Sequence, residues 1–277
     1  MTYKKSYNNT AFTLIELAVV LVILGLLVGG ILVGREMIHA SKLRKVTLAI
    51  HDSVTAVSLF SDKFSELPGD FTRATDYWGA DPNGCPSHNT RIPKQETCNG
   101  NGDGVIGNSY LGTGGTDQRF EYFRFWQHLN NAQLYGGNFT GVTGAEGEEH
   151  FIVGENIPII YDNIGIGAFL QFNSSNEPYL INNSLFPDGK YGNVFVVGGQ
   201  KPDDDPLENS ANFMTPSEAR NIDIKIDDGF PNQGKLIGYP YNRCSTAATS
   251  DDLDADYSQE GDEKLCSFYV RDIIPRL

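Results

Sequence analysis

The hydrophobic pattern changes once along the first sixty residues. Residues 12–33, FTLIELAVVLVILGLLVGGILV, form an apolar run of 22 residues with a single charge, Glu16. At the helical rise this run is about 33 Å long, which is enough to cross the hydrocarbon core of a bilayer. After Val33 the apolar residues recur every three or four positions, which indicates one buried face of an α-helix. These positions are Leu43, Val46, Ile50, Val54, Val57, Phe60 and Phe64.

No proline interrupts this pattern before Leu67-Pro68-Gly69, where two helix breakers follow each other. The pattern therefore predicts one long helix over residues 12–66, apolar on all sides up to Val33 and amphipathic beyond it. Four glycines in this helix each weaken it by about 1 kcal/mol relative to alanine. They either permit local melting or close helix contact, or are simply small residues of a membrane helix. They are Gly25, Gly29, Gly30 and Gly34.

The rest of the chain predicts a mixed fold. Residues 71–111 are loop-like, and aromatic residues on one face predict a second helix at about residues 117–134. Short runs separated by turn signals then predict strands; they lie at residues 151–153, 159–161, 167–172, 194–197, 222–226 and 267–274. Strands that follow helices without βαβ alternation indicate an α+β fold with an antiparallel sheet. We expect this sheet to bury the amphipathic half of the long helix.

The charge is distributed unevenly. The whole chain carries −14, residues 1–11 carry two lysines and no acid, and residues 12–66 are neutral, so residues 67–277 carry −16. A surface this acidic repels nucleic-acid backbones, so we expect no nucleic-acid partner. A hydrophobic content of 40% with 11% aromatic residues suits a packed core and argues against disorder.

The junction between the basic leader and the apolar run carries a family resemblance. Residues 11–17 read AFTLIEL, and the charged segment ends before the hydrophobic region, whereas a secretory signal is cut after its apolar core. This segment resembles the prepilin cleavage and methylation motif of type IV pilins and type II secretion pseudopilins. The family usually has glycine before the cut, where this chain has Ala11.

The resemblance implies a maturation and an assembly step. A prepilin peptidase would remove the leader, residues 1–11, by cutting between Ala11 and Phe12, and would N-methylate Phe12. Glu16, an acid inside an apolar run where a charge is costly, would pair with the terminal amine of a neighbouring subunit. The expected partners are other pilin or pseudopilin subunits, the peptidase, the inner-membrane assembly platform and the membrane itself. Residues 67–277 would form a pilin-like globular domain.

The four cysteines allow three disulfide connectivities. We favour Cys85 with Cys98 and Cys244 with Cys266, because each of these pairs closes a short local loop. Disulfides need an oxidising compartment, so we expect a periplasmic or extracellular domain. With the family resemblance, we expect the subunit to be anchored in the bacterial inner membrane with the leader in the cytoplasm, and the assembled filament to lie in the periplasm or at the cell surface. The positive-inside rule opposes this orientation, since more basic residues follow the span than precede it; those that follow are Arg35, Lys42, Arg44 and Lys45.

A C-terminal acidic segment has the oxygen-ligand spacing of a calcium loop. Asp252, Asp254 and Asp256 alternate, and Glu263 stands at the twelfth position, although the sixth position is not glycine. Major pseudopilins bind calcium through a C-terminal loop, so the resemblance supports calcium as a ligand here. The alternative is a solvated acidic loop.

A second segment has a weaker form of the same spacing. Asn99, Asn101 and Asp103 alternate before a glycine, but the twelfth position of this segment is Tyr110. The bidentate glutamate of a calcium loop is therefore missing. A glycine-rich turn explains these residues at least as well.

No catalytic set stands out in the sequence. Neither H-E-x-x-H nor G-x-S-x-G occurs, and no cysteines and histidines have zinc spacing, so we expect no enzyme activity. We interpret the chain as a filament subunit of a type II secretion pseudopilus or a type IV pilus, with a large domain that favours a minor or tip subunit. The alternative is a membrane-anchored periplasmic binding protein or adhesin that does not polymerise, and an anchored hydrolase is a weaker third.

Overall fold

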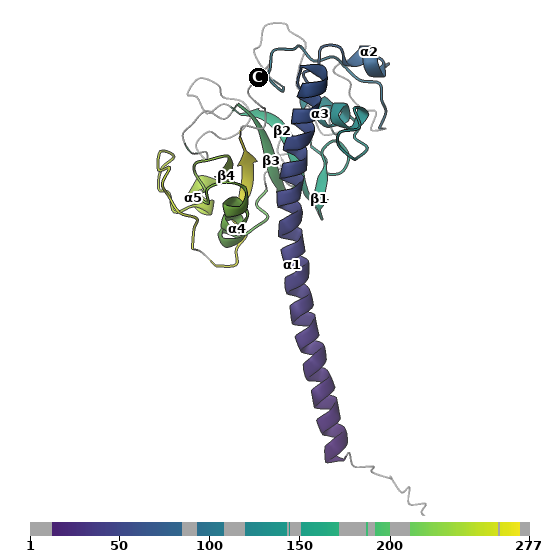
Figure 1. The fold of residues 1–277 in the computed structure, drawn as a ribbon. Coiled ribbons are helices and arrows are strands. Elements are labelled where there is room, and N and C mark those ends of the chain that lie inside the picture. Colours follow the sequence, from purple (N-terminus) through teal and green to yellow (C-terminus); the bar gives the residue numbers. More distant parts are fainter. Residues whose placement is uncertain are drawn as a thin grey trace, which may run out of the picture. The chain divides into compact units, whose positions relative to one another are not determined.

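The computed structural model describes residues 13–84, 93–107, 120–142, 144, 151–171, 187, 192–199, 211–259 and 261–271. The chain divides into two compact units, Met1–Leu43 and Arg44–Leu277. Helix α1, Leu14–Phe64, contributes residues 14–43 to the first unit and residues 44–64 to the second (Figure 1). The predicted long helix is confirmed, with ends two residues inside those expected.

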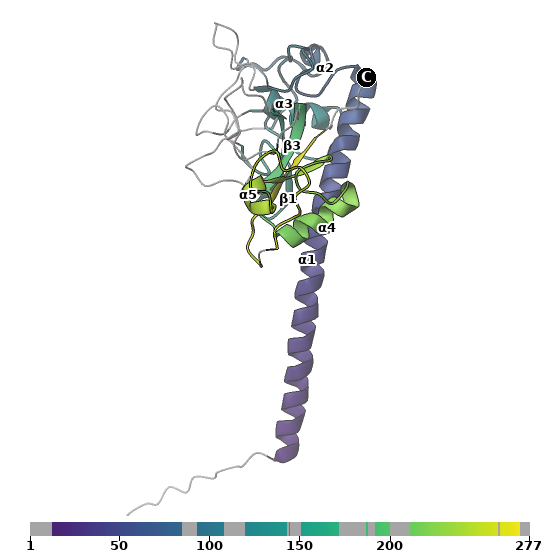
Figure 2. The ribbon, with the colours of Figure 1, turned by 90° about the vertical axis from the view of Figure 1, so that its left-hand side faces the viewer.

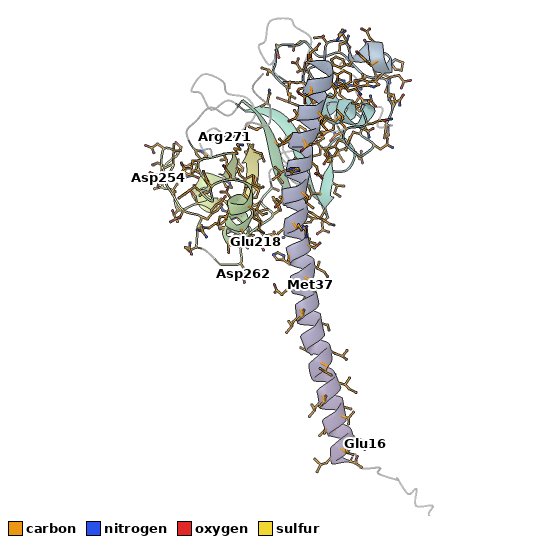
Figure 3. All side chains as sticks on the ribbon, in the orientation of Figure 1. Glu16, Met37, Glu218, Asp254, Asp262 and Arg271 are labelled. Atoms are coloured by element: carbon orange, nitrogen blue, oxygen red, sulfur yellow. A yellow bond between two sulfur atoms is a disulfide. The ribbon has the colours of Figure 1, made fainter. Side chains whose placement is uncertain are left out.

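Within the first unit, the apolar part of α1 is uncovered. Every side chain from Thr13 to Val33 is exposed, and Figure 3 shows these side chains pointing outward all around the helix. So many exposed leucine, isoleucine and valine side chains are unfavourable in water, because removing their apolar surface from water lowers the free energy. This part of α1 needs a membrane or other protein around it.

Within the second unit, residues 44–64 of α1 bury one face. Val46, Ile50, Val57, Phe60 and Phe64 are buried at the predicted three- and four-residue spacing. Leu43 and Val54, which the same pattern includes, are only partly buried. The rings of Phe60 and Phe64 lie 4.5 Å apart between their centroids, so the C-terminal end of the helix is aromatic.

A second helix and an aromatic cluster pack around this end of α1. Helix α3, Phe120–Asn131, lies within the range predicted for it, and the short helix α2, Ala74–Trp78, interrupts the segment expected to be all loop. The ring of Phe71 lies 5.7 Å from that of Phe60, and His128 of α3 lies 6.4 Å from Phe71. On the other side of α3, Trp126 stacks on Phe195 of the sheet at 5.7 Å.

The sheet has five antiparallel strands in the order β1-β2-β3-β5-β4. The strands are β1 Ile159–Tyr161, β2 Ile164–Gln171, β3 Gly192–Gly199, β4 Leu236–Tyr239 and β5 Ser267–Val270. Central strand β3 is buried along residues 193–199, and β4 and β5 are buried throughout. Helix α3 packs beside β2, and helices α4, Pro216–Ile226, and α5, Tyr241–Cys244, pack beside β4. Figure 2 shows α3 and α4 well separated, consistent with strands at different places in the order. The predicted α+β, pilin-like fold with an antiparallel sheet is confirmed.

The strand predicted at residues 222–226 is wrong, because this segment is the last part of α4. Its alternating isoleucines look like a strand, but the helix begins with a complete capping box. The Thr215 side chain accepts the N–H of Glu218, the Glu218 carboxylate accepts the N–H of Thr215, and a proline occupies the first turn. These start signals outweigh β-propensity. Ile222 is buried, whereas Ile224 is 51% exposed.

Of the other predicted strands, one is wrong and four are present. The strand expected at residues 151–153 is also wrong: only an isolated bridge joins Val153 to Ile157, because a turn over residues 154–156 returns the chain at once. Strands at residues 159–161, 167–172, 194–197 and 267–274 correspond to β1, β2, β3 and β5, with residues 172 and 272–274 outside the described residues. Strand β4 and helix α5 were not predicted.

Candidate functional site

The N-terminus of α1 is closed by its own side chains. The backbone N–H and the hydroxyl of Thr13 both donate to Oε2 of Glu16 at 2.8 Å, and the N–H of Glu16 donates to Oγ1 of Thr13 at 3.3 Å. This reciprocal pattern is a capping box, which satisfies backbone N–H groups that the first helical turn leaves without partners. Figure 3 shows Glu16 at this end of the helix. Within a single chain the Glu16 carboxylate therefore has hydrogen-bond donors of its own.

The helix that follows Glu16 has the length and composition to cross a membrane. Its most apolar window has a mean hydropathy of 2.9, and none of that window is buried in the protein. Ala11 and Phe12, the predicted processing site, lie outside the described residues. An apolar helix with an acid at its first turn is thus the feature from which a membrane or assembly role can be argued.

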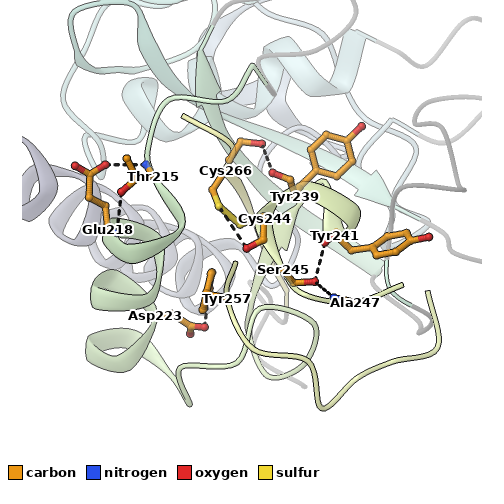
Figure 4. Close-up of a disulfide and its surroundings, with 11 residues drawn as sticks. Thr215, Glu218, Asp223, Tyr239, Tyr241, Cys244, Ser245, Ala247, Tyr257 and Cys266 are labelled. Carbon is orange, nitrogen blue, oxygen red and sulfur yellow. Dashed lines mark hydrogen bonds between the residues drawn. A yellow bond between two sulfur atoms is a disulfide. The ribbon is translucent and has the colours of Figure 1, made fainter. Parts of the chain in front are cut away.

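Of the two predicted disulfides, Cys244–Cys266 is present, with a Cα–Cα distance of 5.0 Å. Both cysteines are fully buried, and the bridge joins α5 to the residue that precedes β5 (Figure 4). Cys98 is disulfide-bonded as well, while Cys85, the partner predicted for it, lies outside the described residues. Two covalent links of this kind fit an oxidising compartment.

The asparagine and aspartate side chains at residues 99–103 are occupied by hydrogen bonds, one to helix α2 and the others within the loop. Oδ1 of Asn99 accepts the N–H of Thr75 at 2.8 Å. Oδ1 of Asn101 accepts the N–H of Asp103 at 3.1 Å, and Nδ2 of Asn101 donates to Oδ2 of Asp103 at 2.7 Å. These contacts are those of a glycine-rich turn, the alternative reading of this segment. Calcium binding at these residues stays a prediction.

Two buried acids that the sequence did not single out hold this loop in place. Asp70 accepts the N–H groups of Gly102 and Gly104 at 2.5 and 2.8 Å, and Glu121 accepts those of Asn101 and Gly107 at 3.1 and 2.8 Å. Burial, with the nearby charge of Asp70 as a smaller cause, raises the pKa of Glu121 to about 8. Burial, with the nearby charge of Asp103 as a smaller cause, raises the pKa of Asp70 to about 6. Four backbone donors on two carboxylates fix the path of the loop.

The acidic C-terminal segment does not form a preassembled group. Asp252, Asp254 and Asp256 are exposed, and no three acids of this segment lie within ligand distance of one another among the residues that the structure describes. Oε1 of Glu263 instead accepts from Nη2 of Arg243 at 3.1 Å. Calcium binding by this loop stays a prediction.

A different acidic cluster comes together at the end of α4. Asp223, Asp227 and Asp228 each place one carboxylate oxygen within 4.8 Å of the others. Burial raises the pKa of Asp223 to about 7, although the hydroxyl of Tyr257 donates to its Oδ2 at 2.8 Å (Figure 4). The spacing D-x-x-x-D-D-G at the end of a helix was the signal for this cluster, but the strand predicted at residues 222–226 concealed it.

Comparison with known families decides what the N-terminal segment is. Residues 7–32 match the model of the prokaryotic N-terminal methylation motif. The chain carries the type IV pilin and pseudopilin signature. The match includes Ala11, Phe12 and Glu16, and it ends inside α1. No curated protein and no solved structure matches the chain.

The methylation motif supports general conclusions about assembly, membrane anchoring and the class of protein. It supports a subunit of pilin or pseudopilin type, which assembles with other pilin subunits after processing by a prepilin peptidase. Together with the apolar helix it fits a single-pass, membrane-anchored protein. It indicates a structural subunit in preference to an enzyme.

Proposed function

We propose that the protein is a minor or tip subunit of a type II secretion pseudopilus or a type IV pilus, which acts mechanically in secretion or fibre assembly. One observation carries the proposal: the methylation motif runs directly into an apolar helix whose side chains from Thr13 to Val33 are all exposed. Such a helix serves first as a membrane anchor and then as the packing surface of a filament. The 211 residues that follow residue 66 form a domain larger than a major subunit needs, which favours a minor or tip position.

The orientation is part of the proposal. The buried Cys244–Cys266 bridge requires oxidation, so the domain that contains it faces the periplasm and the leader stays in the cytoplasm. The filament then assembles from the inner membrane through the assembly platform, with the domain directed outward.

The role of Glu16 follows from the cost of its charge. A carboxylate in an apolar bundle is tolerated only when it is paired, and cleavage before Phe12 creates an amine on every mature subunit. Pairing Glu16 with the amine of a neighbouring subunit would compensate both charges inside the filament. Because Glu16 also caps its own helix, it enters assembly already ordered.

Maturation is the first test. Mass spectrometry of the native protein is expected to find a chain of 266 residues, the 277 of the precursor less the 11 of the leader, that begins with N-methylated Phe12. Ala11→Gly is the matched control, because it restores the residue usual before the cut and is expected to give the same product. An intact leader, or a cut after Val33, would make the chain an ordinary anchored or secreted protein.

Assembly is the second test, and two substitutions separate capping from charge. Glu16→Gln keeps an oxygen that accepts the N–H of Thr13 but removes the charge, whereas Glu16→Ala removes both. If the charge pairs with a neighbour's amine, both variants are expected to insert in the membrane and fold but to enter filaments poorly. Normal incorporation of Glu16→Gln would contradict the pairing, and absence of the wild-type protein itself from filaments would favour an anchored binding protein or adhesin.

A further inference from the structure

Three carboxylates converge at the C-terminus of α4. Asp223 lies in its last turn, Asp227 is its C-cap residue and Asp228 follows, and one oxygen of each lies within 4.8 Å of the others. The C-terminus of a helix carries partial negative charge, so acids there are unfavourable. None of the three forms an ion pair with a lysine, arginine or histidine of the described chain. No ion pair of the described chain therefore compensates their mutual repulsion.

The buried member of the cluster has an oxygen without a hydrogen-bond donor. Asp223 is fully buried; its Oδ2 accepts from the hydroxyl of Tyr257 at 2.8 Å, whereas Oδ1 has no hydrogen-bond partner among the described residues. The N–H of Gly229 lies near this carboxylate and lowers its pKa, but it does not form a hydrogen bond with Oδ1. Leaving a buried acceptor unsatisfied costs about 1–3 kcal/mol, and more when it is charged. A cation coordinated by this oxygen would remove this cost.

The two other carboxylates are held by backbone donors and keep one oxygen each. Oδ2 of Asp227 accepts the N–H of Lys235, and Oδ1 of Asp228 accepts the N–H of Phe230 at 2.8 Å. No described donor reaches the second oxygen of either residue. Gly234 lies against the pair, and a side chain at this position would collide with Oδ2 of both aspartates. A glycine at this position therefore lets the backbone of the loop between α4 and β4 approach the two carboxylates closely.

The spacing of these oxygens fits one class of ligand. Two ligands of the same calcium ion, each at about 2.4 Å, lie at most about 4.8 Å apart, and all three aspartate oxygens meet this limit. Magnesium demands near-ideal octahedral geometry and usually keeps several waters, whereas calcium accepts an irregular set of protein oxygens. We propose that Asp223, Asp227 and Asp228 bind a calcium ion, with water or backbone carbonyls completing its coordination.

A calcium ion at this position would join three parts of the second unit. It would tie the end of α4 to the loop that leads into β4, Leu236–Tyr239. Through the hydrogen bond between Asp223 and Tyr257 it would also connect to the segment enclosed by the Cys244–Cys266 bridge. This position differs from the acidic segment at residues 252–263, so substitutions can distinguish the two.

The test uses the full-length protein in detergent, stripped of metal, with calcium chloride alone as the probe. Wild-type protein is expected to bind one calcium ion by titration calorimetry, and its Tm is expected to rise by several degrees at saturating calcium, because the ion binds the folded state preferentially. Asp223→Asn and Asp228→Asn are each expected to weaken binding at least tenfold. Asp228 is exposed, so its variant should keep the circular dichroism spectrum of the metal-free wild type even if the buried substitution at Asp223 disturbs folding.

The matched control is the double variant Asp254→Asn with Asp256→Asn, which removes two exposed carboxylates from the other acidic segment. It is expected to keep the calcium ion bound by Asp223, Asp227 and Asp228 with the affinity of the wild type; a separate binding event lost in this variant would belong to the acidic segment at residues 252–263. Terbium, a calcium substitute, should also luminesce when tyrosine is excited, since Tyr257 touches Asp223, and the signal should fall in Asp228→Asn. Three results would overturn the proposal: no calcium binding by the wild type, loss of binding only in the control variant, or unchanged binding in both Asp223→Asn and Asp228→Asn.

Discussion

The buried ion pair between Asp81 and Arg124 gives the sharpest prediction about stability. Oδ2 of Asp81 and Nη2 of Arg124 lie 2.7 Å apart, both side chains are fully buried, and Lys94 donates to the other oxygen of Asp81. Asp81→Asn keeps the shape of the side chain but removes its charge. The guanidinium of Arg124 would then remain buried without its counter-charge.

Two routes lead to a similar magnitude. Burial alone would raise the pKa of Asp81, but hydrogen bonds from Lys94, the N–H of Asn83 and Arg124 outweigh burial and hold the pKa at about 2, below its ordinary 3.8. This lowering corresponds to about 2.5 kcal/mol. Removing one partner of a buried pair costs about 3–5 kcal/mol in proteins generally. We therefore expect Asp81→Asn to lower the free energy of unfolding by about 3 kcal/mol at pH 7.

Urea unfolding of the full chain in detergent measures this change. The two tryptophans report on the region directly, since Trp126 is buried on α3 and Trp78 lies 5.4 Å from His128 between ring centroids. The lowered pKa means that the contribution is present above pH 3.8 and is lost as the pH falls through about 2, so wild type and variant should converge in acid. Asp62→Asn, an exposed change on α1, is the control. A loss below about 0.5 kcal/mol, the range of ordinary surface substitutions, would refute the argument.

Three further predictions concern the same domain. Glu121→Gln should flatten the pH dependence of the free energy of unfolding. Because the pKa of Glu121 is raised, its contribution to wild-type stability is complete below about pH 4.5 and falls by up to about 1.4 kcal/mol per pH unit toward pH 8. Equal pH slopes for both proteins in urea titrations would contradict this. Cys244→Ser with Cys266→Ser should cost about 3 kcal/mol by freeing a loop of 22 residues, and unchanged thermal unfolding under non-reducing conditions would count against it. Phe60→Ala should cost about 3–5 kcal/mol, because this ring is fully buried; chemical denaturation should show it, and Leu59→Ala, 47% exposed, should have little effect.

The sequence was most informative where a local pattern and the tertiary environment agree. The three- and four-residue spacing of Val46, Ile50, Val57 and Phe60 predicts both the helix and its buried face, since a period of 3.6 residues brings these positions together. The alternating isoleucines at residues 222–226 led to a wrong strand prediction, because that prediction did not take into account the capping box a few residues earlier. A start signal made of three cooperating residues is better evidence for a helix than a short apolar run.

Helix α3 marks a limit of such patterns. Its polar residues Glu121, Arg124, Gln127 and His128 are all fully or almost fully buried, although the rule of amphipathic helices would place them in water. They are buried because segments distant in sequence supply their partners: Asp81 pairs with Arg124, and Thr97 donates to Gln127 at 2.7 Å. Burial lowers the pKa of His128 to about 3, so it stays neutral at physiological pH. Partners that meet only after folding leave no trace in a sequence window.

Four glycines in the apolar part of α1 lower the stability of the isolated helix but allow close contact between helices in an assembly. A Cβ added at Gly25, Gly29, Gly30 or Gly34 would meet no atom within 4 Å, so nothing inside a single chain requires a glycine there. Replacing all four with alanine would make an isolated helix about 3–4 kcal/mol more favourable. The same methyl groups would hold two helix backbones farther apart wherever glycines allow them to touch. The helix of a single subunit is thus less stable than one with alanines at these positions. Close contact between helices, or local melting of the helix in a filament, would compensate this loss of stability.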